Sequence, residues 1–323
     1  MNPAFSVIFL TTLIGVGQGL FLALFSSQTY TIVNVLPTQS DAYYALGGLI
    51  ALTFLVGGLL ASFFHLGHPE RAWRAASQWR TSWLSREVIA LPTAMGLVFL
   101  YTLVNWFGLD ADLYGWGMRG QVALTVGTLA AAATLALFLC TSMIYGAIKF
   151  LQEWATPLTV VNYFLLGSAS GFTFAAAYAA FMAPDVVQFY AGWAITLTIA
   201  AFFSRVASLF RNARIKRVAT VQTAIGVRHS KVQQRSMGFM GGSYNTREYF
   251  HGKSLLFLKS VKWIFLVLVF PVPLALLWLG LTQGAPMIYV AAFAVQYVGL
   301  LFERWFFFAQ ANHPQNLYYQ FVG

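Results

Sequence analysis

Two neighbouring segments in the first third of the chain carry residues that suit proton and redox chemistry. Residues 64–73 read FHLGHPERAW, and residues 80–87 read RTSWLSRE. An imidazole such as that of His65 can hydrogen-bond a carbonyl group and exchange protons near neutral pH. A carboxylate such as that of Glu87 can give or take protons beside it. The two side chains are therefore candidates to bind a quinone head group and to shuttle its protons.

Arginine and tryptophan residues surround this pair in the sequence, and Arg71 and Arg86 are the closest of the arginines. Both could line the same quinone site. The alternative is structural: an interfacial histidine and a Glu–Arg ion pair that anchor two helix ends. The residue types leave both interpretations open.

Three further polar side chains lie in or at the end of apolar stretches. Gln18 stands between Gly17 and Gly19, where its amide must bond either a neighbouring helix or a ligand. Ser142 and Tyr145 end the fourth apolar stretch on the same side as His65, so they could line the same cavity.

Glu303 and Arg304 lie about two turns from the end of the last apolar stretch. Ionisable groups at that depth are costly unless they are paired. We expect them to pair with each other or with Glu87, as part of either a polar site or an ion pair that locks helices together.

The histidines and the cysteine bear on which cofactors the chain could hold. Bis-histidine haem needs two histidines on facing helices within the bilayer. All of the histidines fall at or beyond the ends of apolar stretches, so we expect no haem: His65, His68, His229, His251 and His313. The single Cys140 cannot form an intramolecular disulfide or hold an iron–sulfur cluster alone, and no zinc-ligand spacing is present.

These residues must be positioned by membrane helices. The chain is 59% hydrophobic and 9% charged, outside the usual range of soluble domains. About eight apolar stretches are each long enough to cross ~30 Å of hydrocarbon as a helix. They are 5–25, 44–64, 88–108, 120–142, 158–182, 189–209, 263–281 and 286–308. The sequence therefore predicts an all-α polytopic membrane protein, with a kink in the seventh helix at Pro271 and Pro273.

Charge is distributed unequally between the two sets of connecting segments. One set holds most of the Lys and Arg residues, in the 65–87 loop, at Lys149 and in the 205–262 segment, which has about a dozen. The other set holds Arg119 and four aspartates. The positive-inside rule places the basic set, and with it both termini, in the cytoplasm.

Residues 1–323 leave no room for a separate soluble domain, so we predict a single integral membrane domain. Its largest extramembrane part is the basic 205–262 loop between the sixth and seventh helices. Within that loop, the aromatic-rich segment 237–250 could fold against lipid head groups, dock a cytoplasmic subunit, or do both. A net charge of +10 in such loops favours anionic lipid or a protein partner over nucleic acid.

The motif His65-Leu-Gly-x-Pro-x-Arg-Ala, followed by Ser82-x-Leu-Ser-x-Glu87, resembles the signature of a known family. It is similar to the membrane anchor subunits of dimethyl-sulfoxide-reductase-type, polysulfide-reductase-like molybdoenzymes. Gly17-Gln18 and Glu303-Arg304 also fit. The resemblance implies a haem-free, quinone-reactive anchor that binds an iron–sulfur subunit, which in turn contacts a molybdopterin catalytic subunit. It implicates His65 and Glu87 in the chemistry of a ubiquinone or menaquinone.

The chain departs from the reductase anchors in orientation, because their partners are periplasmic, and in its long basic loop. Both departures resemble the cytoplasm-facing, quinone-linked sulfite dehydrogenases of sulfur-oxidising bacteria. That resemblance implies a subunit of the bacterial inner membrane, without a molybdenum site of its own, that passes electrons from sulfite oxidation to quinone. The direction of electron flow rests on the resemblance alone. The alternatives are an anchor of a reductase that oxidises quinol, a stand-alone transporter, and a scaffold without a redox role.

Overall fold

The computed structural model describes residues 1–323 apart from 112, 116–119, 217–218, 236–247 and 320–323. Its described part is built from helices without strands, and eight of its helical spans could cross a membrane, as the sequence predicts. The long helices are α1 (Phe5–Ile32), α2 (Asp41–Phe63), α3 (Trp83–Trp106), α4 (Gln121–Gly146), α5 (Pro157–Met182), α6 (Val187–Ala213), α9 (Leu255–Val269), α10 (Pro271–Gln283) and α11 (Pro286–Ala309). The short ones are η1 (Pro69–Gln78), η2 (Pro184–Val186), α7 (Val221–Ile225) and η4 (Pro314–Tyr318).

Hydroxyl side chains set the starting points of several spans. Ser40 accepts a hydrogen bond from the backbone N–H of Tyr43 at the start of α2, and Ser82 does the same for Ser85 at the start of α3. Such caps satisfy backbone N–H groups that have no partner within the helix. The Ser82 cap fixes where α3 begins, and it therefore fixes the depth of Glu87 in the bundle.

The seventh span is interrupted at Pro271, as the sequence predicts. Helix α9 ends at Val269, and α10 begins at Pro271 after Phe270, whose φ of −114° and ψ of −80° are not helical. Proline has no N–H to donate and its ring crowds the preceding turn, so the helix bends there. The bend separates two helical segments that together form one candidate span, Leu255–Gln283.

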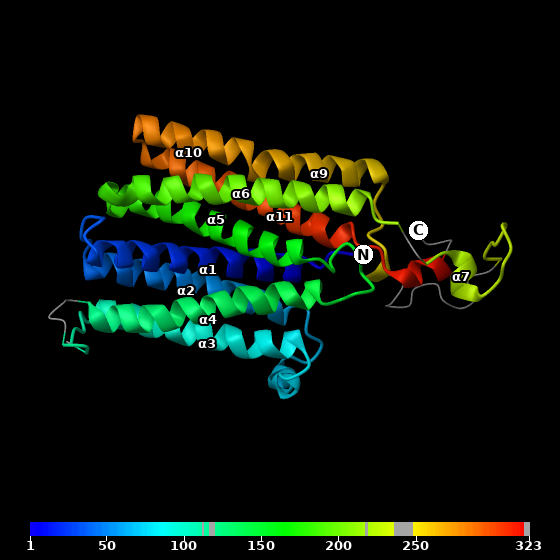
Figure 1. The fold of residues 1–323 in the computed structure, drawn as a ribbon, viewed down its shortest axis with the longest axis horizontal. Coiled ribbons are helices and arrows are strands. Elements are labelled where there is room, and N and C mark those ends of the chain that lie inside the picture. The colour runs from blue at the N-terminus through cyan, green and yellow to red at the C-terminus, as the bar shows by residue number, and fades with distance from the viewer. Residues whose placement is uncertain (112, 116–119, 217–218, 236–247, 320–323) are drawn as a thin grey trace.

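Helices α1 and α5 lie at the centre of the bundle and contact each other closely (Figure 1). Glycines make the approach possible: a Cβ atom on Gly171 would overlap the backbone of Gly19, and one on Gly19 would overlap the backbone of Gly167. Small residues at such crossings let membrane helices pack backbone to backbone. The GSASG run at 167–171 is therefore a packing element.

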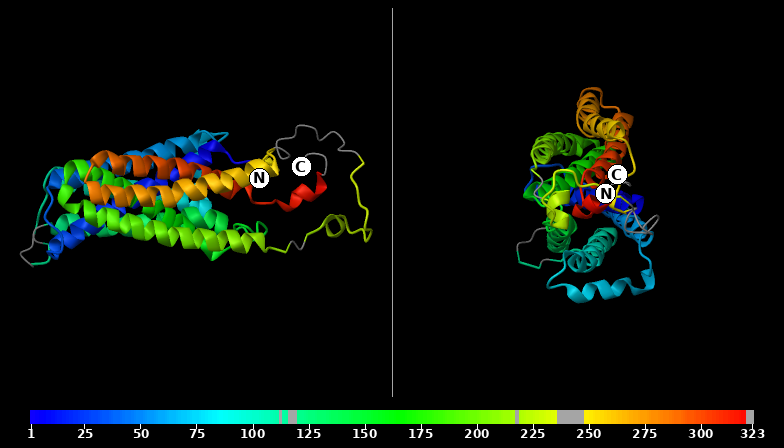
Figure 2. Two further views of the ribbon diagram at one scale, coloured as in Figure 1. Left: turned by 90° about the horizontal axis from the view of Figure 1, so that it is seen from above. Right: turned by 90° about the vertical axis from the view of Figure 1, so that its right-hand side faces the viewer.

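The connections of opposite charge lie at opposite ends of the bundle. Figures 1 and 2 place η1, α7 and the N-terminus at one end, with η1 running across the helix axes. Asp41 starts α2 and Asp185 lies in η2, both at the other end. Arg119 lies outside the described residues. The bundle is therefore polarised along its length, with η1 and the basic segment near α7 at the same end.

The non-helical part of the basic loop is shorter than the 205–262 range that the sequence suggests. Helix α6 continues to Ala213, and α9 begins at Leu255. Apolar side chains continue beyond Arg205 as far as Phe210, which is why α6 stays in the bundle there. Of the aromatic-rich 237–250 segment, residues 237–247 lie outside the described part.

Candidate functional site

A cluster of three charges is buried between α6 and α11. The Nε atom of Arg205 lies 2.7 Å from Oε1 of Glu303, and Nη1 of Arg304 donates to Oε2 of Glu303 over 2.9 Å. None of the three residues is more than 4% exposed. The predicted Glu303–Arg304 pair is present, but Arg205 rather than Glu87 is the other partner. Two cations share one anion, so the cluster carries an excess positive charge inside the bundle.

Arg304 also faces a small polar cavity between α1, α4, α5 and α11. Its guanidinium lies 3.8 Å from the ring centroid of Tyr163. Gln18, Thr141, Tyr163 and Arg304 are among the polar residues that line this cavity. Its volume of about 10 Å³ is close to the minimum that holds one water molecule. The Tyr163 hydroxyl and Arg304 Nε have no hydrogen-bond partner among the described residues, so both could bond such a water.

Gln18 resolves one of the alternatives left open by the sequence. Its Nε2 atom donates to the backbone oxygen of Thr134 on α4 over 3.1 Å, and it also lines the cavity. The amide therefore bonds a neighbouring helix and faces the cavity at the same time.

Glu87 joins this region through a threonine. It is buried on α3, and its Oε1 accepts a hydrogen bond of 2.6 Å from Thr141 Oγ1 on α4. Thr141 also lines the cavity that Arg304 faces. A band of polar groups therefore crosses the bundle from Glu87 through Thr141 and the cavity to Arg304 and Glu303. Its unpaired hydroxyl and guanidinium groups and its carboxylates could bind water and move protons.

His65, Arg71 and Arg86 lie outside this band: His65 and Arg71 are in the connection between α2 and α3, and Arg86 is in the first turn of α3. Arg71 lies 3.6 Å from Glu70, and Arg86 donates to the backbone oxygens of Trp79 and Arg80. Arginine and tryptophan side chains are in contact here: the guanidinium groups of Arg74, Arg80 and Arg86 lie over the rings of Trp73, Trp79 and Trp83, respectively.

His65 follows the end of α2 and is exposed, although neighbouring atoms cover part of its imidazole ring. Partial burial lowers the pKa of its imidazole. In the described part of the chain it shares no hydrogen bond with Glu87. The structure thus leaves the two candidate catalytic residues separate, with His65 at the surface and Glu87 inside the bundle.

Ser142 and Tyr145 follow Thr141 on α4 and behave differently from each other. The Ser142 hydroxyl donates to Leu139 of its own helix. The Tyr145 ring stacks on Tyr163 with centroids 5.8 Å apart, which places Tyr145 next to the residue that Arg304 covers. Tyr145 therefore packs against Tyr163 at the edge of the polar band, whereas the Ser142 hydroxyl is already hydrogen-bonded within α4.

Sequence reasoning missed Arg205, Thr141 and Tyr163. The charge pattern puts Arg205 in the basic loop, although the apolar residues that follow it indicate a continuing membrane helix. Thr141 and Tyr163 carry no charge and stand in helices rich in similar residues, so nothing in the sequence distinguishes them. Only the helix packing shows which of these hydroxyls meet Glu87 and Arg304.

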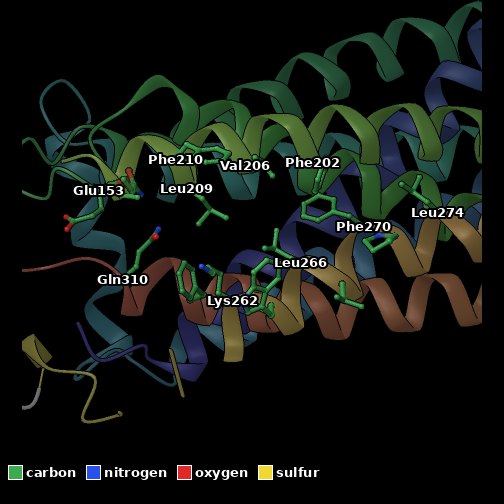
Figure 3. A pocket seen from close by; sticks show the side chains of 16 residues that line it. Glu153, Phe202, Val206, Leu209, Phe210, Lys262, Leu266, Phe270, Leu274 and Gln310 are labelled. Atoms are coloured by element: carbon green, nitrogen blue, oxygen red, sulfur yellow. The ribbon is translucent and has the colours of Figure 1, made fainter. Parts of the chain in front are cut away.

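A second and much larger hollow lies on the other side of the bundle, between α6 and α9–α10 with α11 behind (Figure 3). It has a volume of about 830 Å³. Its lining is apolar along most of its length, for example at Phe202, Leu266 and Leu274, and polar at one end, at Glu153, Lys262 and Gln310. Glu87 and Thr141 on α3 and α4 do not line it.

Comparison with known proteins agrees with this architecture. The model of the family described as DMSO reductase anchor subunit (DmsC) matches residues 1–307. A sulfite dehydrogenase subunit of Allochromatium vinosum is 57% identical over 325 residues, which cover 100% of both chains. A family match over nearly the whole length of the eight-span bundle decides the assignment: the chain belongs to the DMSO reductase anchor subunit family.

Proposed function

We propose that this chain anchors a molybdopterin and iron–sulfur oxidoreductase in the bacterial inner membrane and reduces quinone with electrons from sulfite oxidation. Family membership supports the role of anchor, and the similarity to the sulfite dehydrogenase subunit supports the substrate. The observation that carries the quinone chemistry is the buried Glu87–Thr141 hydrogen bond at the edge of a polar band. A carboxylate is rarely buried away from a cation unless it has such a role.

The basic end of the bundle is the face where the partner subunits dock. In this proposal, that end is cytoplasmic, because positive charge beside membrane helices is retained inside. The exposed arginine–tryptophan pairs of the η1 connection belong to it. An iron–sulfur subunit bound there would deliver electrons one at a time to a quinone at the end of α2, near His65.

Reduction of a quinone to a quinol takes up two electrons and two protons. The head group enters from the bilayer at the α2–α3 end, where His65 hydrogen-bonds one carbonyl oxygen. Glu87 gives a proton to a quinone oxygen and is reprotonated through the Thr141 hydroxyl from water in the polar cavity. The hydrogen bond from the Thr141 hydroxyl is retained by the carboxylate form that Glu87 adopts between the two transfers.

All five histidines lie outside the eight spans, which supports a direct route from the partner's clusters to quinone without haem. The family assignment favours this function over a stand-alone transporter.

The variant Glu87→Gln in the purified complex tests the proposal. We expect sulfite-dependent quinone reduction to fall by about 100-fold, within the range that a general acid–base group contributes. Reduction of an artificial acceptor at the catalytic subunit should be unchanged. Thr102→Val is the matched control: Thr102 is also buried on α3, and its hydroxyl donates to the backbone oxygen of Val98 on its own helix. Equal quinone reduction by Glu87→Gln and Thr102→Val would overturn the proposal.

A further inference from the structure

The groove between α6 and α9–α10 has the size and polarity of a lipid site (Figure 3). We propose that it binds one glycerophospholipid with a primary-amine head group, of the phosphatidylethanolamine class. One acyl chain lies along the groove, and the head group lies at its polar end. The proposal concerns a different part of the bundle from the polar band of Glu87, so it stands independently of the quinone chemistry.

The length of the groove matches one leaflet of the bilayer. It extends along α9 and α10 from Lys262 to Leu274, a rise of about 18 Å at helical pitch. Half of a typical hydrocarbon core is about 15 Å. The groove ends just past the bend at Phe270 and Pro271, near the middle of the candidate span. Its apolar trough thus accommodates a single acyl chain that starts at the interface.

The polar end of the groove offers two opposite charges and a free donor. Lys262 supplies an ammonium group, which lies 5.4 Å from the centroid of the Trp263 ring. Glu153, from the α4–α5 connection, supplies a carboxylate that also interacts electrostatically with the N-terminal ammonium group. Lys262 and Glu153 form no ion pair with each other among the described residues. The Nε2 atom of Gln310 is buried there and lacks a hydrogen-bond partner in the described part of the chain. Figure 3 shows Gln310 between the other two side chains.

A zwitterionic amine head group satisfies all three groups together. Its phosphate accepts from Lys262 and from Gln310 Nε2, and its ammonium donates to Glu153. A head group that is only anionic would place its phosphate near the Glu153 carboxylate and would offer that carboxylate no cation, which is unfavourable. A quinone ring carries no charge and would offer no counter-charge to either Lys262 or Glu153. Charge complementarity therefore selects the amine-containing lipid.

Native mass spectrometry of the delipidated complex tests the assignment, with dioleoyl-phosphatidylethanolamine, -phosphatidylcholine and -phosphatidylglycerol as separate probes. We expect the ethanolamine lipid to be retained most strongly. Lys262→Gln should lower its retention by about fivefold, the effect of one lysine at the membrane surface. Glu153→Gln should remove the preference for ethanolamine over glycerol head groups. Lys259→Gln is the matched control, because Lys259 lies one turn earlier on α9 and does not line the groove.

Comparable retention of the three lipids by the unchanged complex would overturn the proposal. So would equal losses in the Lys262→Gln and Lys259→Gln variants, or recovery of quinone in place of phospholipid. The oligomeric mass of each variant complex, read in the same spectra, shows whether it has assembled, so misassembly cannot be mistaken for lost binding.

Discussion

Arg205 and Glu303 form an ion pair of 2.7 Å between α6 and α11, and both side chains are almost fully buried. Because Arg304 binds the other oxygen of the same carboxylate, the two cations depend on one anion. Loss of Glu303 therefore removes the counterion of both arginines, whereas loss of Arg205 leaves Glu303 paired with Arg304.

Replacing Glu303 with Gln should destabilise the protein more than replacing Arg205 with Met. The first change leaves two buried cations without a counterion, a loss of about 3–5 kcal/mol. The second leaves Glu303 paired with Arg304 as a neutral pair. Thermal unfolding midpoints in one detergent should rank wild type first, then Arg205→Met, then Glu303→Gln. The opposite order of the two variants would show that the charges are compensated elsewhere.

Thr141→Val should slow quinone reduction by about tenfold or more while sparing the artificial-acceptor reaction. The change removes the hydroxyl that bonds Glu87, and hydrogen bonds to charged groups are worth about 1.5–3 kcal/mol. Thr173→Val serves as the control, since Thr173 is buried on α5 and its hydroxyl donates to the backbone oxygen of Ala169 on the same helix. Parallel kinetics of the two variants measure the effect. Equal rates would mean that the Thr141 hydroxyl has no part in proton transfer.

The sequence predicts the number of spans, the bend at Pro271 and the Glu303–Arg304 pair, because each depends on local residue patterns. It does not predict which face of a helix meets which neighbour. From the sequence alone, Arg205 therefore resembles a loop cation, and Glu87 is expected beside His65. The cap at Ser82 places Glu87 more than a turn inside α3, where it faces α4. The depth and rotation of a helix are set by packing, which one sequence does not display.

His65 should give quinone reduction an acid limb below about pH 6.5. Burial lowers the pKa of this imidazole from its ordinary 6.5, so the group is neutral above that pH and takes up a proton only below it. A neutral ring can donate to a quinone oxygen and still accept a proton from water on its other nitrogen, whereas the protonated ring has no acceptor left and cannot relay a proton. His65→Gln keeps a donor and an acceptor without titrating. The pH profile of quinone reduction, divided by that of the artificial acceptor, should lose its acid limb in this variant.

An acid limb that persists in His65→Gln would assign the titration to another group. The shift also affects stability in a defined direction. Since the folded pKa lies below the unfolded one, the unfolded state binds the proton first, and stability decreases as the pH falls below 6.5.

Gly171→Ala should prevent normal packing of α1 against α5. The added Cβ would overlap the backbone of Gly19 and Leu20, and backbone atoms cannot move aside as a side-chain end can. Gly96→Ala on α3 is the control, because a Cβ there would meet no atom of the described residues within 4 Å. The yield of folded protein in the membrane should fall for Gly171→Ala only. Similar yields would mean that the two helices can separate without loss.

Sulfite oxidation by sealed membrane vesicles that contain the complex tests the central claim most directly. Sulfite is an anion that crosses membranes poorly, so it reaches only the exposed face. Inside-out vesicles, which expose the cytoplasmic face, should reduce their quinone when sulfite is added, and right-side-out vesicles should do so only after permeabilisation. Quinone reduction by intact right-side-out vesicles, or none by vesicles of either orientation while the artificial acceptor is still reduced, would contradict the account.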